Sequence, residues 1–234
     1  MPLLTRVALG VCLGLAGLLA SSPSEAASIR GLITYAGAVD AKKLPVTIDQ
    51  YVCGKEKVSE ELVVNTQRGV RDAVVWLHTP PAGASWETAP AKPDKVEMDQ
   101  KGCVFVPRVV LVPAGGTVEF LNSDRLLHNL HSASKENPTF NRTQPRGRAI
   151  PIAFARPEIV RVNCDLHSWM QAWVVVADHP FYAVSNDKGE FALPSVPPGK
   201  YTLKIWQEAL GTTSRDVTVG AEDARVTVEL KAPR

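Results

Sequence analysis

The chain has 234 residues, 45% of them hydrophobic, and a formal net charge of +2 at pH 7. This length is enough for one large or two small domains with real cores. The near-neutral balance argues against nucleic acid or an anionic membrane as a partner.

The N-terminal residues 1–26 predict a secretory signal peptide. One arginine precedes an apolar run over residues 7–20, which is short for a membrane span. Small residues at positions 24 and 26 give a cleavage pattern. Cleavage would leave a periplasmic or secreted protein with no integral membrane segment, and the alternative is a retained anchor.

Short runs of β-branched and aromatic residues recur along the rest of the chain, between clusters of Gly, Pro, Asn and Asp. Helical periodicity is almost absent, and the 18 prolines fit the edges and turns of sheets better than helices. Strands at this spacing predict an all-β protein made of antiparallel sandwiches. Clear examples are "RDAVVWLHT", "TVEFLN", "AWVVVAD", "GKYTLKIWQE" and "ARVTVELK".

A domain boundary is expected near residue 179. His179-Pro180 breaks the preceding strand, and "NDKG" is a tight-turn signal. We therefore expect a first domain over residues 27–178, with an N-terminal strand extension, and a small sandwich over residues 179–234. The segment "DKGEFALPSVPPGKYTLKIWQE" resembles the carboxypeptidase regulatory-like domain, and this resemblance implies a transthyretin-like β-sandwich with a structural or adhesive role.

The stretch "VNCDLHSWM" is the strongest chemical signal in the chain. Cys164, His167 and Met170 stand three apart, and a thiolate, an imidazole and a thioether form a ligand set for a soft ion, copper above all. A short loop cannot surround an ion alone. The strand and turn in "TVEFLNSDRLLHNLHS" supply a fourth ligand, His128.

The two segments together resemble the cupredoxins, the blue-copper Greek-key β-sandwiches. The resemblance implies His128, Cys164 and His167 as equatorial ligands of one copper ion, cycling between Cu(I) and Cu(II), with Met170 as a weak axial ligand. Across most of the chain after residue 26, the sequence also resembles exported bacterial proteins labelled methylamine-utilisation or plastocyanin-like.

The ligand loop departs from the usual mononuclear pattern, because only two residues separate the histidine from the methionine. The same gap occurs in the binuclear copper centre of terminal oxidases. That centre needs a second cysteine in the loop, where this chain has Asp165 and Leu166. The loop therefore indicates a single copper.

Three alternatives concern individual ligands. Cys164 could be a buried structural thiol, because free cysteines are often buried. Met170 could pack in the core instead of binding an ion. His131 is a further candidate ligand, although i and i+3 on a strand point to opposite faces.

Cys53 and Cys103 have no ligand-like neighbours, and an oxidising compartment favours a disulfide between them. In the chain-entropy model, a closed loop of this length stabilises by roughly 4 kcal/mol. The alternative, pairing of either one with Cys164, would remove the thiolate from the site.

No nucleophile elbow, phosphate loop or zinc-protease helix occurs, so we expect no enzyme. The leading hypothesis is a one-electron carrier that serves an unidentified redox partner in the periplasm. One alternative is a non-redox protein that stores, delivers or senses copper. Another is a structural or carbohydrate-adhesive module that uses exposed aromatics such as Trp206.

Overall fold

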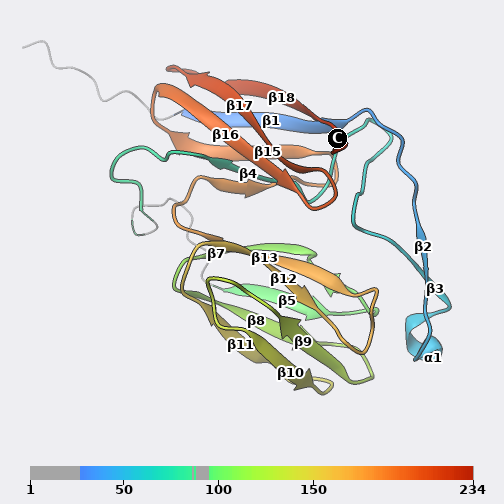
Figure 1. The fold of residues 1–234 in the computed structure, drawn as a ribbon. Coiled ribbons are helices and arrows are strands. Elements are labelled where there is room, and N and C mark those ends of the chain that lie inside the picture. Colours follow the sequence, from blue (N-terminus) through green and yellow to red (C-terminus); the bar gives the residue numbers. More distant parts are fainter. Residues whose placement is uncertain (1–26, 86, 88–94, 234) are drawn as a thin grey trace, which may run out of the picture.

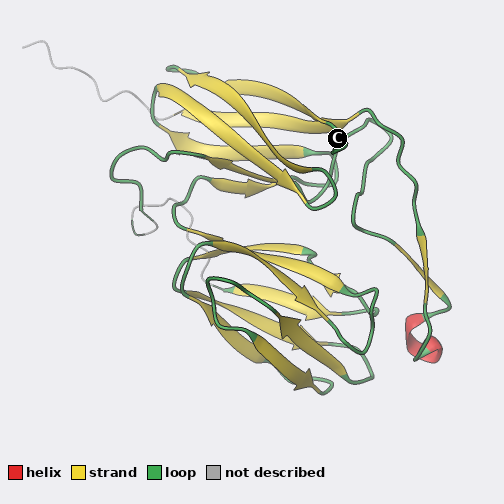
Figure 2. Cartoon of the chain, viewed as in Figure 1, coloured by secondary structure: helices red, strands yellow, loops and turns green. Residues whose placement is uncertain are grey.

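The computed structural model describes residues 27–85, 87 and 95–233, and the expected signal peptide lies outside them. The regular secondary structure of the described chain is strand except for one short helix, as Figure 2 shows, so the predicted all-β sandwich class is confirmed. Two sandwiches lie one above the other, and an arm extends along one side (Figure 1). Within the described ranges, no helix is long and apolar enough to cross a membrane.

The first sandwich carries the candidate metal ligands and consists of two sheets. Its five-stranded sheet has the order β10-β9-β12-β13-β7, with β7 Val109–Pro113, β9 His128–Ser132, β10 Phe140–Gln144, β12 Glu158–Asn163 and β13 Gln171–Ala177. Its four-stranded sheet has the order β11-β8-β5-β6, with β5 Val96–Gln100, β6 Phe105–Val106, β8 Gly116–Asn122 and β11 Ile150–Phe154. Alternation in β8 buries Val118, Phe120 and Asn122 on the inner face.

The second sandwich is also built from two sheets. One has the order β15-β1-β18, with β1 Ala27–Tyr35, β15 Glu190–Val196 and β18 Ala224–Leu230. The other has the order β14-β4-β16-β17, with β4 Val74–Leu77, β14 Tyr182–Val184, β16 Gly199–Gln207 and β17 Gly211–Val219. Most strand pairs are antiparallel, as expected, but β1 with β18, β5 with β8 and β7 with β13 run parallel.

The expected division of the chain at residue 178 differs from this arrangement. Strands β1 and β4 belong to residues 27–178, yet each is a central strand of a sheet in the second sandwich. Their inward side chains, including Ile29, Ile33 and Leu77, share one core cluster with Leu203 and Ile205 of β16. The second sandwich therefore contains sequence from both sides of the expected boundary.

The arm, residues 43–58, connects these two N-terminal strands in sequence and lies against the first sandwich. It consists of β2 Lys43–Pro45, the single turn of helix α1 Gln50–Cys53 and β3 Glu56–Val58. The expected Cys53–Cys103 disulfide is present, and Cys164 is free and buried. Val46 and Cys53 are buried in the core cluster of the first sandwich, so the arm is part of that core.

The two sandwiches meet through aromatic and charged side chains. Trp173 of β13 and Trp206 of β16 form an edge-to-face pair with ring centroids 4.9 Å apart. Trp206 therefore packs between the sandwiches and is not the exposed aromatic that the adhesive hypothesis expected. Arg108 donates to Glu208 at 2.7 Å, and both side chains are more than nine-tenths buried.

Candidate metal centre

The expected ligands converge at one end of the first sandwich because three strand ends meet there. His128 opens β9, while Cys164 directly follows β12 and begins the tight loop that leads into β13. Two backbone hydrogen bonds close this loop, from the Met170 amide to the His167 carbonyl at 2.8 Å and from the Cys164 amide to the Met170 carbonyl at 3.2 Å. The loop therefore returns His167 towards Cys164.

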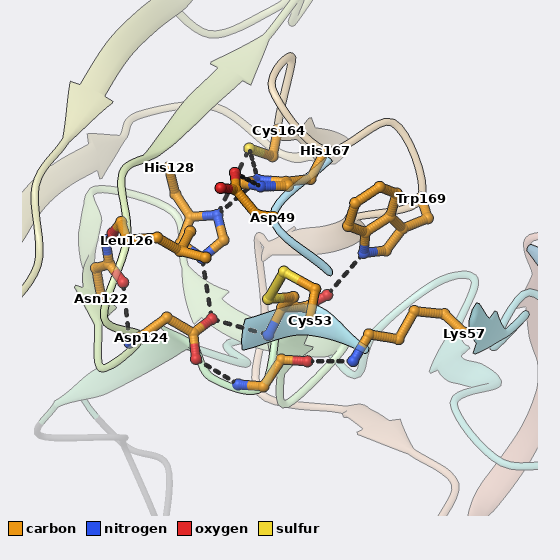
Figure 3. Close-up of a disulfide and its surroundings, with 12 residues drawn as sticks. Asp49, Cys53, Lys57, Asn122, Asp124, Leu126, His128, Cys164, His167 and Trp169 are labelled. Atoms are coloured by element: carbon orange, nitrogen blue, oxygen red, sulfur yellow. Dashed lines mark hydrogen bonds and ion pairs between the residues drawn. A yellow bond between two sulfur atoms is a disulfide. The ribbon is translucent and has the colours of Figure 1, made fainter. Parts of the chain in front are cut away.

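Three donor atoms form a compact triangle at this end (Figure 3). The Nδ1 atoms of His128 and His167 are 3.0 Å apart, and Cys164 Sγ lies 3.8 Å from the first and 3.4 Å from the second. Both imidazoles are 0% exposed and Cys164 is 2% exposed. The sequence-predicted histidines and cysteine are thus brought together out of contact with solvent.

The triangle contains more hydrogen-bond acceptors than donors. Each histidine points its Nε2 atom at an aspartate carboxylate, which can only accept, so we assign both Nε2 atoms as protonated. Both Nδ1 atoms are then acceptors, and among the described residues the one donor that faces them is the thiol proton of Cys164. The two Nδ1 atoms are 3.0 Å apart, and their lone pairs point at each other inside the protein. A cation bound between them would accept both lone pairs.

The spacing of the donors also fits an ion. Metal–nitrogen bonds of about 2.0 Å and a metal–sulfur bond of about 2.3 Å keep three such donors roughly 3–4 Å apart. The observed separations of 3.0, 3.4 and 3.8 Å lie in this range. Two imidazoles and one thiolate are the donor set of mononuclear copper electron-transfer sites. The residues present therefore fit a single copper ion.

Burial shifts the pKa values of two of the donors, His128 and Cys164. Burial lowers the pKa of His128, although the hydrogen bond to Asp124 raises it, so this imidazole is neutral and able to bind a cation at neutral pH. Burial raises the pKa of the Cys164 thiol, although the Asn129 amide directed at its sulfur lowers it. Metal binding would therefore displace the thiol proton.

Asp124 fixes the ring of His128. Its Oδ2 atom lies 2.9 Å from His128 Nε2, and the carboxylate also accepts from the Gly102 amide at 2.6 Å and the Cys103 amide at 2.8 Å. A carboxylate on the outer nitrogen of a ligating histidine fixes the tautomer and the orientation of the ring. The turn between β8 and β9 thus aims Nδ1 of His128 into the triangle.

Asp49, from the arm, contacts Nε2 of His167 in the same way as Asp124 contacts Nε2 of His128. Its Oδ2 atom lies 3.1 Å from His167 Nε2, across 118 residues of sequence. Trp169 packs on the other side of this imidazole, with ring centroids 5.1 Å apart, and donates its Nε1–H to the Cys103 carbonyl at 3.0 Å. Both histidines are thus held from outside by carboxylates.

Asn129 links the two ligand-bearing segments. Its backbone amide points at Cys164 Sγ at 3.5 Å, and its side-chain oxygen accepts from the Asp165 amide at 2.5 Å. The side-chain amide donates to Asn141 at 2.8 Å. The residue after the first histidine therefore fixes the backbone beside the cysteine.

The two remaining ligand candidates from the sequence are Met170 and His131. Met170 is 1% exposed and belongs to the same large core cluster as Cys164, and its axial role stays a prediction. His131 directs Nδ1 to Asp165 at 2.8 Å and has a side chain 40% exposed. Among the described residues, His131 lies outside the donor group of His128, Cys164 and His167.

A second cluster overlaps the first but lacks a free thiolate. Cys103, Asp124 and His128 have potential donor atoms close together. Cys103 Sγ, however, is bonded to Cys53, and the Asp124 carboxylate already accepts two backbone amides and His128. This cluster is the outer support of His128 and not a separate metal site.

Comparison with family models gives one match. The model described as "Polysaccharide lyase family 4, domain II" matches residues 145–227, which is less than half of the chain. No curated protein matches the chain.

Solved structures that resemble this one include two cupredoxins. Amicyanin from Paracoccus versutus is 20% identical with a TM-score of 0.34, covering 44% of this chain and 97% of its own. A purple cupredoxin from Nitrosopumilus maritimus is 20% identical with a TM-score of 0.32, covering 36% of this chain and 100% of its own.

A copper-containing nitrite reductase from Thermus scotoductus SA-01 is also similar. It is 22% identical with a TM-score of 0.35; the match covers 43% of this chain but only 28% of the reductase. Because these identities and TM-scores are low, the chemistry of the site is argued from its own donor atoms and not from these structures.

Sequence reasoning identified the three residues whose donor atoms the structure brings together, but it missed both aspartates. Asp124 stands four residues before His128 in a turn that also contains Asn122, and this spacing is a local signal that could have been used. Asp49 has no such signal, because it reaches His167 only through the folding of the arm.

Proposed function

We propose that the chain is a mononuclear copper protein that carries one electron, outside the cytoplasm, for a redox partner. The observation that supports this most is the buried triangle of two Nδ1 atoms and one thiol sulfur, with each imidazole oriented from behind by a carboxylate. Copper bound there would supply a one-electron couple between Cu(I) and Cu(II).

The chain's own residues would favour such a couple by resisting movement. The imidazoles are fully buried and each is hydrogen-bonded at Nε2 to a carboxylate, and the loop from Cys164 to Met170 is closed by its own backbone hydrogen bonds. Donors that are preorganised in a dry site undergo little rearrangement when the charge of the ion changes. We expect no catalysis, because no donor of the triangle is exposed to a substrate.

The alternative roles are less well supported by this geometry. Delivery of copper to another protein requires exchange of ligands, and a triangle with exposures of 0% and 2% is closed to an incoming donor. The adhesive role would need aromatic rings at the surface, whereas Trp206 packs on Trp173 between the sandwiches. Electron transfer requires neither ligand exchange nor an exposed ring.

Visible absorption during a copper titration tests the proposal. Adding Cu(II) to the wild type should produce an intense thiolate-to-copper band that ascorbate bleaches and an oxidant restores. Cys164→Ser should lack the band, because a hydroxyl cannot replace the covalency of a thiolate. His131→Ala, which changes an exposed histidine on the same strand as His128, is the matched control and should keep the band. An unchanged band in Cys164→Ser would refute the proposal.

A further inference from the structure

The support of His167 comes from a part of the chain that is not in the first sandwich's sheets. The ring is 0% exposed, and its outer nitrogen meets Asp49 of the arm at 3.1 Å. Among the described residues, the contact of this nitrogen is Asp49, whereas Trp169 meets the imidazole as a tilted ring at a centroid distance of 5.1 Å. The arm therefore supplies the hydrogen-bond acceptor for Nε2 of His167.

Asp49 gives up its ordinary local role to make this contact. It stands at the N-cap of α1, where an aspartate side chain usually accepts a backbone amide of the first turn. Here its side chain makes no capping hydrogen bond, and the backbone adopts the left-handed conformation with φ 51°. Such a conformation is uncommon for a residue other than glycine and is found at functional positions. The side chain of Asp49 therefore has no capping role in α1 and makes its contact with His167 instead.

Several interactions hold the arm in place around Asp49. Gln50 Nε2 donates to the Val46 carbonyl at 2.6 Å, and the Val46 amide donates to Lys55 at 3.0 Å. Lys57 Nζ reaches the Gly102 carbonyl at 2.6 Å. Because Val46 is 2% exposed, the turn that carries Asp49 is both hydrogen-bonded and packed into the core.

The disulfide links this turn to the support of the other histidine, as Figure 3 shows. Cys53 ends α1, four residues after Asp49, and is bonded to Cys103. The amides of Gly102 and Cys103 hold the Asp124 carboxylate, which in turn holds His128. One covalent bond thus joins the two segments that orient the two imidazoles.

We propose that Asp49 and the Cys53–Cys103 disulfide form one positioning unit, which fixes the ring of His167 for metal binding and couples it to His128. This inference rests on the proposed copper site and adds an outer support supplied by the arm. Asp49 is a positioning residue: it does not touch the ion, and it acts through the Nε2–H of His167.

Asp49→Ala tests the unit in the copper-loaded protein. The variant should keep the thiolate-to-copper band, because all inner ligands remain, but its affinity for copper should fall about 10- to 100-fold, as is typical when an outer partner of a ligating histidine is lost. Competition with a chelator of known affinity measures the change. Asp49→Asn keeps an acceptor oxygen without the charge and should restore part of the loss.

Glu56→Gln is the matched control. Glu56 lies on the same arm and pairs with Lys43 at 2.7 Å, away from the imidazoles. This variant should bind copper as the wild type does. An Asp49→Ala protein with wild-type affinity would overturn the inference while leaving the copper site intact. Absence of a band in the wild type would instead count against the copper site itself.

A measurement on the metal-free protein separates positioning from general stability. In nitrogen-15 NMR spectra, the Nε2–H of His167 should be protected from exchange with water in the wild type and in Glu56→Gln, and should exchange rapidly in Asp49→Ala. Equal protection in all three proteins would contradict the role of Asp49, whatever metal the site binds.

The coupling through the disulfide has its own test. Replacing both Cys53 and Cys103 by alanine should lower copper affinity in the same direction as Asp49→Ala. Adding Asp49→Ala to that protein should then change affinity by much less than it does in the wild type, because the contact is already loosened. Full additivity of the two effects would show that the disulfide does not act through Asp49.

Discussion

At the scale of single residues, the candidate metal centre depends on which ring nitrogen of each histidine is available to bind an ion. Carboxylates occupy Nε2 of both histidines, so both Nδ1 atoms are left as acceptors facing Cys164. The grouping of His128, Cys164 and His167 could be predicted from sequence because these residue types are scarce and the spacing in "NCDLHSWM" is characteristic. Asp49 could not, because its contact depends on a tertiary arrangement that spans 118 residues.

The predicted axial ligand, Met170, can be tested through the reduction potential. If Met170 donates weakly, its thioether favours the more highly charged ion, so Met170→Leu should raise the reduction potential while keeping the visible band. Met170→Gln should lower the potential, because a harder oxygen donor favours Cu(II). Voltammetry on copper-loaded variants measures both shifts.

The same variants contain a control for packing. Met170 is 1% exposed, and a volume-conserving change to leucine should cost less than about 1.5 kcal/mol of stability. Equal potentials in the wild type and Met170→Leu would remove Met170 from the ligand set and leave it as a core residue.

At the scale of elements, strands and loops were predictable to different degrees. The strand over β8 and the turn before β9 followed from alternation and turn residues, and they place His128 as expected. The parallel pairing of β5 with β8 and of β7 with β13 could not be predicted, because alternation within a strand carries no information about its neighbour's direction. The arm was also missed, since its short strands have no clear period.

The loop between β9 and β10 is held by one carboxylate on β12. Glu158 accepts from the amides of Lys135, Glu136 and Asn137 at 2.7, 3.1 and 3.2 Å and also from the Ser134 hydroxyl. Partial burial raises the pKa of Glu158, but these hydrogen bonds outweigh burial and lower it from 4.5 to about 2. The stabilisation is therefore fully present above about pH 4.5 and is lost as the pH falls towards 2.

Glu158→Gln should consequently lower the free energy of unfolding by about 1–3 kcal/mol at pH 7. The difference from the wild type should shrink as the pH falls from 4.5 towards 2. Urea unfolding across this range measures it. Glu136→Gln, in the same loop with a side chain 58% exposed, is the control and should have little effect. A pH-independent difference for Glu158→Gln would show that its charge does not hold the loop.

At the scale of the whole molecule, the chain leaves the second sandwich and returns to it twice, first through the arm and then through the strands from β5 to β13. Strands β1 and β4 sit in the middle of sheets otherwise formed by residues 182–230. The sequence has a strand break at His179-Pro180 and a turn signal at residues 186–189, and a boundary near residue 179 follows if each domain is contiguous. That assumption failed because β1 and β4 pair with strands more than a hundred residues away.

A fragment of residues 179–234 should therefore be unfolded by itself. It lacks the strand between β15 and β18 and the strand between β14 and β16, so both of its sheets lose their central pairing. Circular dichroism and amide dispersion in proton NMR spectra should show no stable sheet. A cooperatively folded fragment would mean that β1 and β4 are additions to a self-sufficient domain. The chain from residue 27 to 234 is the control and should fold.

The central claim is that one buried ion is bound by His128, His167 and Cys164. X-ray absorption at the copper edge of the stoichiometrically loaded protein tests it most directly, because it counts the nearest neighbours of the metal by element. The structure predicts two nitrogen neighbours and one close sulfur in the wild type, with the close sulfur absent in Cys164→Ser. A copper ion surrounded only by nitrogen and oxygen in the wild type would contradict the account.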